Sequence, residues 1–499
     1  MTPTAQATRR RLDLAALADL PADMRPRVDP RGLGVGIVHL GIGAFHRAHQ
    51  AVYTEDAIAA AGGDWGICGV TERSPAVADA LGPQDGLYTV AVRGADGERR
   101  RVIPSVREVR WARADPEALT RRIADPATAI VTLTVTEKAY RLDPGTGRLR
   151  DGDPDLEADL RGGSTRTVVG QLVAGLARRR AHSGAPITVV CCDNLPSNGA
   201  TLRDLVHDFA RRRAPRDGLS AWLADHVRFP STMVDRIVPA TTAADRRALA
   251  AATGLADEGL VVTEPFSQWV IEDYFAGPRP AWERAGAIMT DRVWPYERIK
   301  LRMLNGSHST LAYLGMLADH EFVADAIASD GLCHVIAGLM AIDVAPTLRV
   351  PDGFDLLHYR DDLLRRFANR ALRHRTAQIA LDGSQKLPGR LLGTIRDRRA
   401  HGAEPALAAL GVAAWMRVVS VRRSDSGRPL TIEDPLGGEI AARVGSLHGP
   451  RQIVDALLAM REIFGADLAA DRGLCDLLVD LVERLGRDGA EATARSLTA

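Results

Sequence analysis

The sequence predicts an α/β fold in its first part and a mainly α-helical second domain. Before residue 290, short apolar runs typical of buried strands alternate with helical patterns, which indicates a parallel sheet. Further on, apolar residues recur at helical spacing almost without interruption. The expected helices there are 309–328, 331–345, 357–367, 404–418, 451–464 and 472–486. We therefore expect two domains, 34–290 and 291–499.

Charge and composition exclude several classes of function. The chain has 499 residues and a formal net charge of +1, which argues against a broad binding surface for nucleic acid or an anionic membrane. No apolar run reaches the length of a membrane span, and the N-terminus lacks the apolar core of a secretory signal. We expect a soluble protein of the cytoplasm. The five cysteines lack metal-ligand spacing, so we expect neither a structural metal nor a disulfide framework.

A glycine turn follows the first expected strand, Gly36–Leu40, and precedes a helix expected from His46. Strand, glycine turn and helix together cradle the pyrophosphate of a dinucleotide, because glycine lets the backbone approach the phosphates. This predicts a Rossmann-type domain, although the usual third glycine of the motif is replaced. The candidate cofactor-binding residues of the turn are Gly41, Gly43, Ala44 and Phe45.

The second expected strand, 65–70, supports this interpretation, because it ends next to Glu72 and Arg73. An acid at this place accepts the adenosine ribose hydroxyls, which favours NAD. Arg73 could instead accept the 2′-phosphate of NADP or stack on adenine. An exposed charged pair at the end of a strand is the alternative.

Two later strands, 129–135 and 187–192, are expected around an amphipathic helix at 168–180. Sheets of this kind bind ligands at the carboxyl ends of their strands. Asn194 follows the second of these strands and is therefore a candidate site residue. An Asx turn or the N-cap of the next helix is the alternative.

The segment Lys300–His308 has an unusual polar face. Read as one α-helix, it places Glu297, Lys300, Asn305 and His308 on one side together with two leucines. Burying such a cluster is costly, so folding alone does not explain it. The alternative is a surface helix with a solvated lysine and a local Glu297–Lys300 ion pair.

Six segments together resemble the long-chain mannitol dehydrogenase family, and the similarity runs from about residue 34 to 465. They are Gly41–Gln50, Leu133–Lys138, Cys192–Asn194, Met233–Pro239, Glu264–Glu272 and Lys300-x4-Asn305-x2-His308. The resemblance implies a Rossmann-type N-terminal domain, a helical C-terminal domain and a metal-independent reaction in the cleft between them. Members interconvert a secondary alcohol of a polyol or sugar acid with its ketone, using NAD(H) or NADP(H). Monomers are common among them, so we expect a monomer.

The resemblance also implies roles for the polar face. Lys300 would be the general base, and its pKa, normally near 10.4, would have to be lowered by desolvation and by the positive nicotinamide ring. Asn194 and Asn305 would donate hydrogen bonds to the developing alkoxide. His308 would orient the substrate. Glu297 would relay protons or gate water behind the lysine.

The segment 369–388 bears on the substrate. It resembles fructuronate reductases (D-mannonate oxidoreductases) of the family more than mannitol 2-dehydrogenases, which carry an arginine where Gln378 stands. His374 and Gln378 are expected on one helical face, with Lys386 after an Asp-Gly turn, where they could bind a carboxylate. The leading expectation is therefore oxidation of D-mannonate to D-fructuronate. Mannitol 2-dehydrogenase or another polyol dehydrogenase is the alternative, and a catalytically inactive NAD-binding relative is a third.

Overall fold

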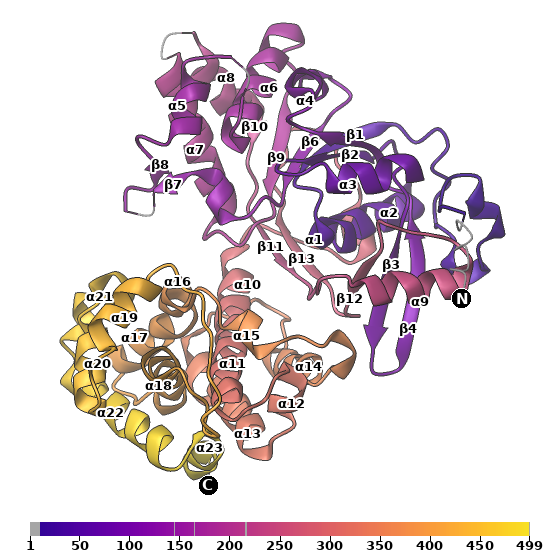
Figure 1. Ribbon diagram of the computed structural model, residues 1–499. Helices are drawn as coiled ribbons and strands as arrows, with labels where there is room; N and C mark the ends of the chain where they lie inside the picture. Colours follow the sequence, from indigo (N-terminus) through magenta and orange to yellow (C-terminus); the bar gives the residue numbers. More distant parts are fainter. Residues whose placement is uncertain (1–9, 144, 164, 215–216, 499) are drawn as a thin grey trace, which may run out of the picture. The chain divides into compact units, whose positions relative to one another are not determined.

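The chain folds into two compact units, the first ending at Val293 and the second beginning at Trp294 (Figure 1). The computed structural model describes residues 10–143, 145–163, 165–214 and 217–498. Residues 144, 164 and 215–216 of the first predicted domain and residue 499 of the second therefore lie outside the described residues. Among the described helices, none combines the length and the apolarity needed to cross a bilayer.

A six-stranded parallel sheet forms the centre of the first unit, in the order β5-β2-β1-β6-β9-β10. Its strands are β1 (Val35–Leu40), β2 (Gly66–Thr71), β5 (Val106–Trp111), β6 (Ile130–Leu133), β9 (Ile187–Cys191) and β10 (Val227–Arg228). Numbered along the chain, these six strands follow the order 3-2-1-4-5-6 of a dinucleotide-binding Rossmann sheet. The prediction of a Rossmann-type α/β fold is confirmed.

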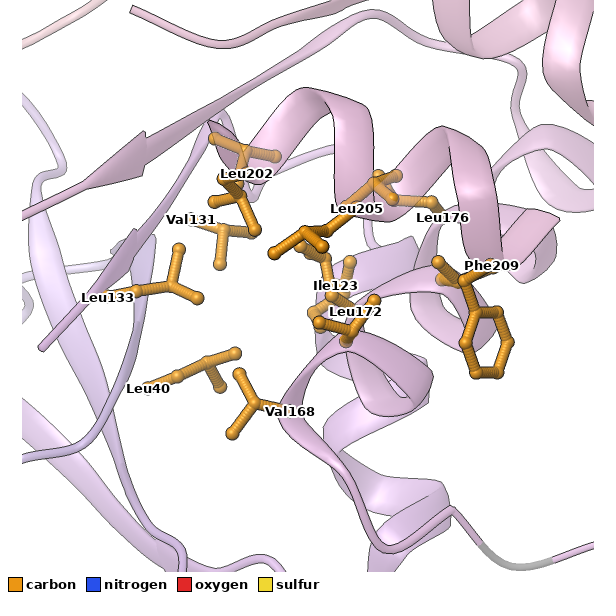
Figure 2. Close-up of a cluster of buried hydrophobic side chains, with 14 of the residues drawn as sticks. Leu40, Ile123, Val131, Leu133, Val168, Leu172, Leu176, Leu202, Leu205 and Phe209 are labelled. Carbon is orange, nitrogen blue, oxygen red and sulfur yellow. The ribbon is translucent and has the colours of Figure 1, made fainter. Parts of the chain in front are cut away.

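Helices cover one face of this sheet and bury its apolar side chains. Figure 2 shows Leu40, Val131 and Leu133 of the strands facing side chains of α4 (Pro116–Ala124), α6 (Val168–His182) and α7 (Asn198–Arg213). Burying each such leucine or valine contributes about 1.5–3 kcal/mol. The opposite face, which includes Ile37 and Ile67, belongs to a second apolar cluster. Both faces are thus covered, which explains why the strands read as continuous apolar runs.

Two three-stranded sheets and a two-stranded one, β7 (Leu142–Asp143) with β8 (Arg148–Leu149), extend the first unit; the three-stranded sheets are as follows. One has the order β11-β13-β14, with strands Thr232–Asp235, Gln268–Glu272 and Ile288–Thr290. The other has the order β12-β3-β4, with strands Val261–Thr263, Tyr88–Gly94 and Gly97–Ile103. The remaining helices of this unit include α1 (Ala44–Ala48), α2 (Gln50–Ala61), α3 (Ala76–Leu81), α5 (Pro154–Leu160), α8 (Leu219–His226) and α9 (Ala243–Thr253).

The second unit is mainly helical, as predicted. Its helix α18 (Ala406–Val421) is buried along most of its length and packs against α11 (Ser307–Leu317) and α22 (Arg472–Arg487). Other helices of this unit are α10 (Trp294–Ile299), α12 (Val323–Ile327), α13 (Asp330–Gly338), α14 (Leu356–Phe367), α15 (Thr376–Ile379), α16 (Gly383–Leu387), α17 (Gly393–Ala400), α19 (Gly437–Val444), α20 (Pro450–Leu458), α21 (Arg461–Ala469) and α23 (Ala490–Thr498). Three π-helices interrupt the α-helical pattern: η6 (Lys300–Gly306), η7 (Leu339–Val344) and η10 (Pro388–Leu392).

Two helices expected in the second unit are divided. The segment 451–464 forms most of α20 and the start of α21, which are separated by Ala459 and Met460. The segment 309–328 forms most of α11 and all of α12, because Asp319 adopts a left-handed φ of 64°. The N–H of His320 then bonds back to the carbonyl oxygen of Gly315 at 2.8 Å, which ends the helix.

Candidate active site

The glycine turn after β1 leaves room for a phosphate group. Gly41 has a φ of 92°, and a Cβ added there would lie 2.2 Å from the carbonyl oxygen of Thr134, so only glycine fits. At Gly43 the nearest atom to an added Cβ is 3.8 Å away. The open space over Gly43, next to the start of α1 at Ala44 and Phe45, fits the close approach of a pyrophosphate.

A neutral histidine, His39, contacts the backbone of this turn. The Nε2 atom of His39 lies 3.2 Å from the carbonyl oxygen of Gly41, and the Thr134 hydroxyl donates to the same oxygen at 2.9 Å. Burial lowers the pKa of His39 to about 3, so the ring is uncharged at neutral pH. The helix expected from His46 begins earlier, at Ala44, and breaks at His49 into α1 and α2.

Glu72 lies directly after β2, beside Gln171 of α6, and Arg73 next to it is exposed. Burial raises the pKa of Glu72 to about 7, opposed by a hydrogen bond with Gln171 and by the charge of Arg113. Its Oε1 atom is buried and has no hydrogen-bond partner among the described residues. A buried acceptor at the end of the second strand fits a ribose hydroxyl, so these residues suit an adenine dinucleotide.

The raised pKa of Glu72 predicts a pH-dependent affinity for the dinucleotide. A ribose hydroxyl donates best to the ionised carboxylate, so binding weakens as pH falls through about 7 and protonates Glu72. We expect the Kd for NADH, measured by fluorescence, to rise about threefold to tenfold between about pH 8 and about pH 6. In Glu72→Gln this pH dependence should disappear. An unchanged pH dependence in that variant would contradict the role.

Asn194 lies at the carboxyl end of β9 and is exposed. The N-cap of the next helix, α7, is Ser197 rather than Asn194, so the N-cap interpretation is wrong. Its position at the end of a parallel strand remains that of a ligand-binding residue.

Lys300 and Asn305 lie on a π-helix, η6, between the α-helices α10 and α11. The expectation of one α-helix, which put these two residues roughly 140° apart around the axis, is therefore wrong. In a π-helix the hydrogen bonds join residues five apart, so Lys300 and Asn305 are about one wide turn from each other. The sequence pattern did not reveal this, because a π-helix changes the period only locally.

The polar face is buried at Lys300 and His308. Lys300 is 9% exposed and His308 is 7% exposed, while Asn305 and Glu297 are partly exposed. A surface helix with a solvated lysine is therefore excluded. Burying an amine and an imidazole on neighbouring turns, beside a partly exposed amide, is costly for folding, which points to a function for the cluster.

His308 is a neutral imidazole in basic surroundings. Burial lowers its pKa well below the usual value, and His374, Arg390, Arg366 and Lys386 lower it further. The rings of His308 and His374 lie 5.1 Å apart at 76°, and burial lowers the pKa of His374 to about 4. The buried atoms His308 Nε2 and His374 Nδ1 have no hydrogen-bond partner among the described residues. Two neutral rings with open hydrogen-bonding positions can bind substrate hydroxyl or carboxylate oxygens.

The segment that carries His374 is less helical than expected. Arg373 adopts a left-handed φ of 47°, and α15 begins only at Thr376, so His374 and Gln378 do not share a helix. The prediction of one common face is wrong, and Gln378 is exposed. Lys386 lies on α16 and donates to the carbonyl oxygen of Leu381 at 2.5 Å.

Two arginines near this cluster were missed by sequence reasoning. Arg390 of the π-helix η10 donates to the hydroxyl of Ser309 at 2.9 Å and lies 3.5 Å from the carbonyl oxygen of Asn305. Arg366 of α14 also lowers the pKa of His308. The chain has many arginines, so no local signal distinguishes these two from surface charges.

Glu297 lies on α10 at a groove of about 320 Å³ within the second unit. The groove runs along α10 and η6 on one side and η10 on the other. Its lining residues are Trp294, Glu297, Arg298, Leu301, Arg302, Pro388, Gly389 and Gly393. Water in such a groove could exchange protons with the Glu297 carboxylate.

The candidate residues thus form two groups, one in each unit. The first unit carries the glycine turn, Glu72 and Asn194 at the carboxyl ends of parallel strands, as a dinucleotide-binding protein does. The second unit carries the buried cluster around Lys300. The family model described as the mannitol dehydrogenase Rossmann domain matches residues 35–284, and the mannitol dehydrogenase C-terminal domain matches residues 292–486. The chain belongs to the mannitol dehydrogenase family.

Similar proteins span nearly the whole chain. The uncharacterized oxidoreductase YeiQ of Escherichia coli is 45% identical over 89% of this chain and 90% of its own. The D-mannonate oxidoreductase of Escherichia coli is 40% identical over 95% of this chain and 98% of its own. Among solved structures, the Pseudomonas fluorescens mannitol 2-dehydrogenase, in a ternary complex with NAD and D-mannitol, matches with a TM-score of 0.87 and 37% identity. The match covers 98% of this chain and 99% of the mannitol 2-dehydrogenase chain.

Proposed function

We propose that the protein is an NAD(P)-dependent oxidoreductase that interconverts a secondary alcohol of a sugar acid or polyol with its ketone without a metal ion. The observation that carries this proposal is the cluster of buried Lys300, buried His308 and partly exposed Asn305, in which the amine lies one wide helical turn from the amide. Such a cluster supplies a base and a hydrogen-bond donor to a hydroxyl group. NAD is the expected cofactor because Glu72 offers a buried acceptor to the ribose.

Each residue of the proposal has one task. Gly41, Gly43, Ala44, Phe45, Glu72 and Arg73 hold the dinucleotide, which when bound accepts hydride from the carbinol carbon. Lys300 takes the hydroxyl proton, for which its amine must be unprotonated; burial is one means by which proteins achieve this. Asn305 and Asn194 donate to the oxygen as negative charge develops. His308 orients the substrate through a neighbouring hydroxyl. Glu297 passes the proton on to water in its groove.

The basic surroundings of His308 favour a sugar acid over a polyol as the substrate. The pKa of His308 is lowered by burial and by the positive charges of Arg366, Arg390 and Lys386. The ring of His374 packs against the His308 ring. A carboxylate gains charge-assisted hydrogen bonds in such a place, whereas a hydroxyl gains less. We therefore propose D-mannonate and D-fructuronate as the leading substrate pair. D-mannitol and D-fructose are the second candidate pair, because the similar mannitol 2-dehydrogenase binds D-mannitol in its ternary complex.

Kinetics with two ketones distinguish these candidates. We expect kcat/KM for D-fructuronate to exceed that for D-fructose by about 10-fold to 150-fold, since one charge-assisted contact contributes about 1.5–3 kcal/mol. His374→Ala should raise KM for fructuronate about tenfold and change the small rate with fructose little. Gln378→Ala is the matched control, because Gln378 is exposed on the same segment. Equal losses for both ketones in His374→Ala would count against binding of the carboxylate.

A coupled screen over polyols and aldonates, with NAD and with NADP, tests the proposal as a whole. Oxidation of at least one aldonate or polyol is expected, with NAD the better cofactor. If no alcohol is oxidised and no ketose or keto-uronate is reduced, the protein is instead a catalytically inactive NAD-binding relative. We also expect a monomer located in the cytoplasm.

A further inference from the structure

The side chain of Asp193 joins the ends of two neighbouring strands, β6 and β9. Its Oδ2 atom accepts the N–H of Val135 at 2.9 Å and the hydroxyl of Tyr140 at 2.6 Å. Its Oδ1 atom accepts the N–H of Thr136 at 3.0 Å. All three partners donate, so the site is built for the ionised carboxylate. Burial raises the pKa of Asp193, and these hydrogen bonds oppose that rise.

Thr136, which Asp193 holds, has a strained backbone. Its φ of 76° and ψ of 150° lie in a region that is essentially restricted to glycine. Such a conformation persists only where the surroundings fix it; the Thr136 N–H donates to Asp193, and the Thr136 carbonyl oxygen accepts the N–H of Ala139 at 3.0 Å. Strain of this kind concentrates at functional sites.

Thr134, directly before the strained segment Val135–Thr136, contacts the glycine turn. The Thr134 hydroxyl donates to the carbonyl oxygen of Gly41, and the Thr134 carbonyl oxygen occupies the place where a Cβ on Gly41 would stand. On the other side, the Asn198 side chain donates to the carbonyl oxygen of Asp193 at 3.0 Å and so fixes the backbone next to Asn194. Asp193 is therefore the direct link between the segment beside the glycine turn and Asn194.

We infer that Asp193 is a positioning residue that sets the place of the Asn194 amide relative to the glycine turn, through its hydrogen bonds to the strained segment Val135–Thr136. The inference rests on the proposed function, because it concerns the donor role of Asn194 there. Asp193 acts through its neighbours and is assigned no contact with a substrate. A donor displaced by about 1 Å from a reacting oxygen costs about 100-fold in rate.

The test is Asp193→Asn. The asparagine side chain has nearly the shape of aspartate, but its N–H₂ group faces at least one of the three donors and cannot accept a hydrogen bond from it. We expect kcat to fall about 30-fold to 100-fold, with the Kd for NADH changed less than about threefold. Thr136→Gly added to this variant should recover about tenfold in kcat, because glycine adopts the strained conformation without help. Thr136→Gly alone, as the matched control, should stay close to wild type. A merely stabilising Asp193 would lower the Tm and leave kcat per folded enzyme unchanged.

Asn194→Ala separates the inference from the proposed function. If Asn194→Ala keeps wild-type kcat, the donor role that the proposed function gives to Asn194 is wrong, and the inference about Asp193 falls with it. If Asn194→Ala loses activity while Asp193→Asn keeps wild-type kcat, or loses it without rescue by Thr136→Gly, only the inference is overturned.

Should Asp193→Asn not fold, Tyr140→Phe removes one of the three donors. It should lower kcat about threefold to tenfold with rescue by Thr136→Gly; an unchanged kcat, or a loss without rescue, overturns the inference.

Discussion

Replacing Lys300 by alanine is expected to lower kcat for alcohol oxidation by about 100-fold to 10,000-fold near neutral pH, the usual contribution of a positioned general base. The amine is buried on the π-helix, 9% exposed, so bulk water has little access to replace it. The Kd for NADH should change little, because Lys300 belongs to the helical unit and the dinucleotide-binding residues to the other. Steady-state kinetics and NADH fluorescence measure the two quantities separately.

Lys300→Arg is the matched control for charge. A guanidinium keeps the positive charge but does not lose its proton in proteins, so it cannot serve as the base. We expect Lys300→Arg to be as inactive as Lys300→Ala. A Lys300→Arg enzyme with more than about a tenth of the wild-type kcat would show that the charge matters and the proton transfer does not.

Asn305→Ala is expected to have the second-largest effect, a loss of about 100-fold to 1,000-fold in kcat with KM changed less than about threefold. The amide lies one wide turn from Lys300 and donates to an oxygen whose charge develops only in the transition state, so its loss affects kcat more than substrate binding. Steady-state kinetics of alcohol oxidation at saturating NAD measure both constants.

Gln385→Ala is the control for Asn305→Ala, since it removes an exposed amide from α16 of the same unit. It should leave both constants unchanged. If Asn305→Ala raises KM and spares kcat, Asn305 binds the substrate and its transition state equally well.

The parts of the fold that follow from local periodicity could be predicted from the sequence. The strands around Val38, Val131 and Val189 read as apolar runs because both faces of the sheet are buried. The glycine turn was recognisable because Gly41 has no tolerated substitute so close to Thr134. Lys300, Asn305 and His308 were recognisable because polar groups that share a helical segment with leucines are costly to bury, and because they match the family pattern Lys-x4-Asn-x2-His.

Other features depend on contacts that no local pattern contains. The π-helix at Lys300 changes the period over only seven residues. The helix expected around His374 fails because Arg373 takes a left-handed conformation and α15 begins only at Thr376, which propensity alone does not predict. The bond from Thr136 to Asp193 joins residues 57 positions apart. Tertiary contacts of this kind decide the geometry of the site, whereas the sequence indicates mainly its residue types.

Alcohol oxidation after exhaustive chelation of metals, followed across pH in the wild type and in Lys300→Ala, tests directly whether Lys300 takes the proton. We expect the chelated wild-type enzyme to keep its full kcat/KM and to show an ionisation on the acidic side, below which activity is lost as the amine becomes protonated. That ionisation should be absent from the residual activity of Lys300→Ala. Loss of wild-type activity on chelation, restored by added Zn²⁺, or an unchanged ionisation in Lys300→Ala, would contradict the role of Lys300 as the base.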